Sequence, residues 1–127
     1  MKHDVTLPVV SLLTLLLLSL HITHDTVLQA EGSMKYPIPV IVFSLWLYAT
    51  LMAPNRVWGY LVMLLGGIFG AAMIVVHAQG TVVGKSEGFF FVWTLFALSA
   101  TGWVTLLLSA RGLWRGFRAR RLGRSGE

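Results

Sequence analysis

Four long apolar segments, separated by short polar stretches, make up most of this chain. They cover about residues 5–26, 37–53, 57–78 and 88–110, and the last three contain no Asp, Glu, Lys or Arg. About 20 apolar residues, each rising 1.5 Å along a helix, cross the roughly 30 Å hydrocarbon core of a bilayer. In hydrocarbon every backbone amide needs a partner within the protein, which a helix provides. The pattern therefore predicts an all-α fold, an integral membrane four-helix bundle.

The connection between the second and third segments is the shortest of the three. "APNR", Ala53 to Arg56, contains a proline and an asparagine, which end one helix and turn the chain into the next. So short a link predicts antiparallel neighbours, and we expect all four helices to alternate in direction. The second segment has only 16 residues from Ile38 to Ala53, but Tyr36 and Pro37 can extend it at the interface.

The basic residues are distributed unequally over the two sides that this topology defines. Lys2, Arg56 and six arginines after position 110 fall on one side, and only Lys35 and Lys85 fall on the other. The positive-inside rule then places both termini in the cytoplasm. A cleaved signal peptide is the alternative for the first segment and would leave three spans. The terminal "MKHD" is barely positive, however, and no small-residue cleavage site follows the apolar run closely.

Composition adds the compartment and excludes some chemistry. The 127 residues are 56% hydrophobic and 12% charged, whereas a soluble domain has about 25% charged residues. The chain has no cysteine, which excludes disulfides, thiolate metal sites and thiol–disulfide exchange. No constellation for nucleophilic catalysis is visible, so we expect a protein that is not an enzyme.

The basic tail, residues 111–127, directly follows the fourth span. Such a run typically contacts anionic lipid headgroups, each basic residue contributing about 1 kcal/mol near the surface. We therefore expect lipid contacts and no nucleic acid. The arginines concerned are Arg111, Arg115, Arg118, Arg120, Arg121 and Arg124.

Small residues recur four apart on two of the predicted helices. Without water to drive association, such positions let helix backbones approach closely. We expect them to pack the bundle internally, and the alternative is that one face docks another protein in a homo- or hetero-oligomer. The positions are Gly66, Gly67, Gly70 and Ala71 on the third helix, and Ala97, Thr101 and Thr105 on the fourth.

Two histidines and an aspartate close the first apolar segment. At 100° per residue, His21 and Asp25 share a face, and His24 lies to one side of it. His77 ends the third segment on the face of Gly70, and the two helix ends lie at similar depth. We therefore expect His21 and His77 to converge at the outer surface. Imidazoles from facing helices are typical ligands of metal ions and haem in bundles.

Besides a proton-titrating pair, two interpretations of this cluster remain open. The first is that the side chains only face headgroups and water, so that no cofactor is bound. The second is a site for a single metal ion or one haem, formed by His21, Asp25 and His77, with His24 as a further ligand. The corresponding functions are a non-catalytic structural or accessory membrane subunit and a metal- or haem-binding membrane protein.

The stretches "SLHITHD", "LVMLLGGIFGA", "FFFVWTLFAL" and "LLSARGLW" together resemble an uncharacterised family of small bacterial integral membrane proteins with four spans. The resemblance covers nearly the whole chain. It implies four spans in the bacterial cytoplasmic membrane and brings no activity with it.

Overall fold

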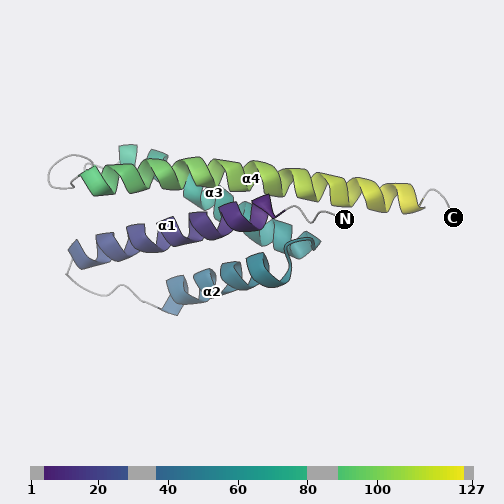
Figure 1. The fold of residues 1–127 in the computed structure, drawn as a ribbon, viewed down its shortest axis with the longest axis horizontal. Helices are drawn as coiled ribbons and strands as arrows, with labels where there is room; N and C mark the ends of the chain where they lie inside the picture. The colour runs from purple at the N-terminus through teal and green to yellow at the C-terminus, as the bar shows by residue number, and fades with distance from the viewer. Residues whose placement is uncertain (1–4, 29–36, 80–88, 125–127) are drawn as a thin grey trace.

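The computed structural model describes residues 5–28, 37–79 and 89–124, and the side chains of residues 5–23, 40–78 and 89–123. These ranges form four α-helices and no strand (Figure 1). The helices are α1 (Thr6–Leu28), α2 (Pro37–Met52), α3 (Val57–Gln79) and α4 (Phe89–Arg124). Each begins within a residue of the apolar segment that predicted it. The all-α prediction is therefore confirmed.

The fourth helix differs from its predicted segment at its C-terminal end. Sequence analysis divided the chain at Ala110, but α4 continues without a break to Arg124 and is 36 residues long. Its last turns reach beyond the other three helices (Figure 1). The described part of the basic tail is thus a helical extension of the last apolar segment.

The turn between α2 and α3 follows from Pro54. Proline has no N–H and cannot continue the ladder of α2. The amide of Ala53 still donates to the carbonyl of Ala49 at 3.1 Å, and the amide of Arg56 donates back to the carbonyl of Ala53 at 3.1 Å. The chain therefore turns from α2 into α3 within the four residues from Ala53 to Arg56.

Three of the helices are long and apolar enough to cross a membrane. The qualifying stretches are Thr6–Thr23, Val57–Ala78 and Phe89–Gly123. The second helix has 16 residues, of which Val40–Met52 form a shorter apolar helix. By length and composition, three of the four described helices are typical of membrane spans.

Large apolar side chains are exposed on the described helices, and several polar side chains are buried between them. Large apolar side chains are exposed along every helix, including Ile41, Leu65 and Phe96. Eight polar side chains, by contrast, are buried within the described part of the chain: Ser11, Thr14, His21, Thr50, Thr94, Ser99, Thr105 and Ser109. In proteins that fold in water, Ser and Thr side chains are mostly exposed.

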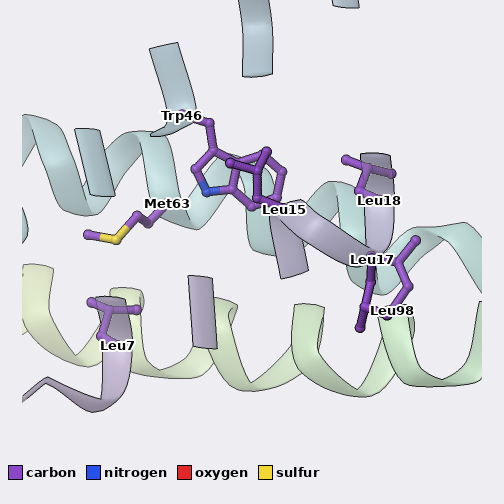
Figure 2. Close-up of a cluster of buried hydrophobic side chains, with 7 residues drawn as sticks. All are labelled: Leu7, Leu15, Leu17, Leu18, Trp46, Met63 and Leu98. Atoms are coloured by element: carbon purple, nitrogen blue, oxygen red, sulfur yellow. The ribbon is translucent and has the colours of Figure 1, made fainter. Parts of the chain in front are cut away.

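A small apolar cluster lies where the four helices meet, and Figure 2 shows its side chains. The first helix contributes four leucines, and α2, α3 and α4 contribute Trp46, Met63 and Leu98. The leucines are Leu7, Leu15, Leu17 and Leu18. Met63 of α3 and Leu98 of α4 are fully buried in it.

Hydrogen bonds between hydroxyl side chains connect α1 to two neighbours. The indole N–H of Trp46 donates to Ser11 Oγ at 2.9 Å, and Ser11 and Thr50 hydroxyls lie 3.0 Å apart. Thr50 donates its own hydrogen to the Trp46 carbonyl at 2.9 Å, so Ser11 donates to Thr50. By the same reasoning Thr14 donates to the Val10 carbonyl at 2.8 Å, and Thr105 of α4 donates to Thr14 at 3.0 Å. Every hydroxyl in these two groups has a partner.

The backbones of α3 and α4 lie close together at two glycines. A Cβ added to Gly67 would lie 2.6 Å from the backbone nitrogen of Leu106. One added to Gly102 would lie 2.6 Å from the carbonyl carbon of Gly70 and would also meet the backbone of Ala71. Real Cβ atoms do not come so close to backbone atoms, so only glycine fits at these two positions.

The predicted packing positions are all at least half-buried, but not all of them touch the same neighbour. Gly66 faces the indole ring of Trp46 on α2 rather than α4. On α4, Thr105 is buried while Ala97 and Thr101 are half-buried, and the hydroxyl of Thr101 bonds within its own helix. Gly102 lies one residue from the predicted stripe and was not among the predicted packing positions. A glycine inside an apolar span was the available signal.

We predict that Gly102→Ala destabilises the protein by about 1–3 kcal/mol, because the added methyl group forces the backbones of α3 and α4 apart. Thermal unfolding of the purified protein in detergent measures the effect. Gly123→Ala is the matched control, since a Cβ there meets nothing within 4 Å. Equal unfolding temperatures for the two variants would contradict close packing at Gly102.

Candidate functional site: a histidine pair

The two histidines predicted to converge lie side by side at one end of the bundle. His21 is on the buried face of α1, in line with Thr14 and Leu18, and is only 1% exposed. His77 is half-buried near the end of α3, on the face that Gly70 packs against α4. The regular helices therefore bring residues 56 positions apart to the same level.

The ring nitrogens of the pair face each other. The Nε2 atoms of His21 and His77 lie 3.3 Å apart. The ring centroids are 4.9 Å apart and the ring planes meet at 76°, an edge-on arrangement. Geometry thus agrees with the expectation that the two side chains share one site.

The other ring nitrogen of His77 determines where the hydrogens lie. Its Nδ1 is 2.9 Å from the carbonyl oxygen of Met73, one turn earlier on α3. A carbonyl only accepts, so Nδ1 of His77 carries a hydrogen, and Nε2 of the neutral ring is an acceptor. In the neutral pair, Nε2 of His21 therefore donates to Nε2 of His77. The backbone of α3 holds the second ring in position.

Phe91 forms the apolar wall of the site. It is 1% exposed, and its ring centroid lies 4.8 Å from that of His21 and 5.5 Å from that of His77. Phe91 belongs to the first turn of α4, so three helices build the site. Phe91 was not predicted from the sequence, because the pattern does not distinguish one aromatic residue in "FFFVW" from its neighbours.

The remaining predicted ligands are only partly placed. Asp25 and His24 belong to α1, one turn beyond His21, but their side chains lie outside the described residues. Among the side chains that the structure describes, no group of three or more His, Cys, Asp or Glu residues could hold a metal ion. The described part of the site therefore provides two nitrogen ligands.

The separation of the two nitrogens fits two kinds of chemistry. It is somewhat long for a hydrogen bond, for which about 2.9–3.0 Å is the usual distance. Two nitrogens bound to one tetrahedral zinc ion at about 2.0–2.1 Å stand about 3.3–3.4 Å apart. In addition, an imidazole that binds a metal commonly donates its other N–H to a carbonyl, as His77 does to Met73.

A haem fits this arrangement less well than a single ion. Two axial histidines of one haem lie on opposite faces of the macrocycle. Here the two imidazoles touch edge to face, and the phenyl ring of Phe91 packs against both of them. A single ion needs only one nitrogen of each ring directed toward it, and the two Nε2 atoms already lie 3.3 Å apart.

The predicted lipid-contacting arginines lie at the other end of α4. The side chains of Arg111, Arg115, Arg118, Arg120 and Arg121 are exposed, and that of Arg124 lies outside the described side chains. Arg111 and Arg115 also line a pocket.

Comparison with known proteins gives no further guide to the site: no protein-family model, no curated protein and no solved structure matches this chain.

We predict an energetic coupling of about 1 kcal/mol between the two histidines, because each ring satisfies a nitrogen of the other in an apolar environment. A double-mutant cycle of His21→Leu, His77→Leu and the double variant measures it by unfolding in detergent. Single losses that add within about 0.3 kcal/mol would show that the contact contributes nothing.

Proposed function

We propose that the chain is a four-span membrane protein with antiparallel helices and both termini in the cytoplasm. The observation that carries the proposal is the distribution of polarity: large apolar side chains are exposed along every helix, and buried hydroxyl groups bond to one another across helices. In a bilayer this distribution is favourable at the surface and in the interior of the bundle. Lipid covers the apolar surface, and every buried donor in these hydroxyl groups has an acceptor.

The contacts of α3 and α4 support opposite directions for these two helices. Phe91, at the start of α4, meets His77 near the end of α3. Gly102 meets Gly70 in the middle, and Gly112 meets Tyr60 near the start of α3. With α2 and α3 joined by a four-residue turn, the same alternation extends along the chain. The bacterial cytoplasmic membrane is the compartment that the family resemblance implies.

Within this membrane protein, the first proposed role is that of a non-catalytic structural or accessory subunit. The second helix supports it: α2 packs against α1 and α3, and most of its apolar side chains point away from them. Leu45, Tyr48 and Leu51 are each more than half exposed. Lipid or a neighbouring subunit would cover this surface.

We predict that reporter fusions after Glu127 and within residues 80–85 report opposite sides of the membrane, with the C-terminal fusion in the cytoplasm. The eight basic residues on the predicted inner side provide the reason. A periplasmic C-terminus would reverse the orientation, and cleavage of the N-terminus would remove α1 from the bundle.

The histidine pair supports a second role, the binding of one transition-metal ion near the outer surface. Nε2 of His21 and Nε2 of His77 would be ligands, with Asp25 and His24 as further donors. Zinc and copper(II) both accept imidazole ligands. For the ion to bind between neutral rings, the hydrogen of His21 must move from Nε2 to Nδ1, while the Met73 carbonyl keeps His77 in its present form.

We predict that chelator-treated protein in detergent binds one zinc ion per chain, and that His21→Ala and His77→Ala each weaken binding at least about 100-fold. Isothermal titration measures the affinity. The control is His3→Ala, which removes a histidine from the other predicted end of α1. Asp25→Asn tests the third ligand.

Zinc binding that is absent, or unchanged in both alanine variants, would leave the pair as a hydrogen-bonded contact only. A Soret band in the freshly purified protein would show that the site binds haem and not a single metal ion.

A further inference from the structure

A pocket of about 340 Å³ lies at the end of the bundle opposite the histidine pair. It is formed where α4 passes the start of α1 and the turn between α2 and α3. Leu7, Pro8 and Leu108 provide apolar walls, and Arg111 and Arg115 provide the charge. None of the described residues that line it is acidic.

The sequence "RGLWRG" explains why two positive charges meet at this pocket. An Arg-Gly pair recurs after four residues, so Arg111 and Arg115 lie one helical turn apart on the same face of α4. Like charges at this spacing repel each other. An anion held between the two guanidinium groups would turn this repulsion into attraction.

The glycines of the two pairs have different roles. A Cβ on Gly112 would run into the ring of Tyr60, so this glycine lets α3 approach α4. A Cβ on Gly116 would meet only Cγ2 of Val57, at 3.8 Å. Packing therefore does not require a glycine at position 116. Its missing side chain instead leaves the space beside Arg115 open.

We propose that this pocket binds the phosphate group of an anionic phospholipid headgroup. Guanidinium groups bind phosphate oxygens through paired N–H donors. The pocket lies where the apolar part of α4 gives way to its run of arginines, so a headgroup and the start of its acyl chains meet charge and apolar wall together. Unlike diffuse attraction to the basic tail, this is one site with two particular arginines.

Free inorganic phosphate carries the same chemistry, and the apolar walls favour the lipid over it. The choice of a lipid rests on the proposed membrane placement. Binding measured in detergent does not depend on topology, however, so failure of this inference would leave the fusion experiment unaffected.

The test compares variants that remove equal charge from the same helix. Full-length protein in detergent is titrated with phosphatidylglycerol, and retained lipid is counted by native mass spectrometry. We expect Arg111→Gln with Arg115→Gln to weaken binding of the first lipid about tenfold. The matched control, Arg118→Gln with Arg121→Gln, removes two arginines that do not line the pocket and should change binding less than about twofold. Equal losses would overturn the site in favour of diffuse attraction.

A second pair of variants changes the space and not the charge. We expect Gly116→Leu to fill the pocket and weaken binding by a similar factor, with unfolding temperature retained. Gly123→Leu, where a Cβ meets nothing within 4 Å, should bind as the parent does. Unchanged lipid binding in Gly116→Leu would overturn the pocket.

Two further measurements identify the anion. If millimolar inorganic phosphate displaces the lipid and chloride at equal ionic strength does not, the ligand of the pocket is free phosphate and the lipid proposal is wrong. Asp4 lies outside the described residues, shortly before Leu7 in the sequence. A several-fold gain in lipid binding on Asp4→Asn would show that this carboxylate is the anion that the arginines hold, and would overturn the lipid. Parent-like binding in Asp4→Asn supports it.

Discussion

The backbone contact between α3 and α4 is the interaction on which the other contacts of this bundle depend. Gly67 and Gly70 lie against Gly102 and Leu106 so closely that no Cβ fits at Gly67 or Gly102. For helices surrounded by lipid, burial of apolar side chains gives little driving force, because lipid tails are as apolar as leucine. Contact between backbones at the narrowest positions supplies dispersion attraction instead. The most extensive helix pair in the structure is accordingly the one with the most glycines.

Polar groups then determine how α1 joins this pair. Its buried face carries Ser11, Thr14 and His21, spaced so that each meets a different helix. Ser11 bonds to α2, Thr14 accepts from Thr105 of α4, and His21 faces His77 of α3. A register shift of one residue along α1 would break all three contacts and leave buried polar groups without partners, at a cost of about 1–3 kcal/mol each. Leucines alone would not fix the register in this way.

Most of the fold followed from the sequence because apolar length and turn residues are local signals. The four helices and the turn at Pro54 needed no knowledge of tertiary contacts. The convergence of His21 and His77 was also predictable, since helical spacing fixed both face and depth. Phe91 and Gly102 were missed because their roles depend on which residues lie opposite, and sequence spacing on one helix does not contain that information. The helical continuation to Arg124 was missed because a change in polarity ends an apolar segment without ending a helix.

The histidine pair and the arginine pocket lie at opposite ends of the bundle and differ in burial and charge. At one end, two imidazoles and a phenyl ring pack between three helices, so a small cation would bind there through the nitrogens that face each other. At the other end, Arg111 and Arg115 line a pocket and their side chains are exposed. Their permanent charge suits a large anion that stays partly in water. The contrast arises from burial. His21 is 1% exposed and must find its partner inside the protein, whereas the side chains of Arg111 and Arg115 are exposed and can bind a partner from outside it.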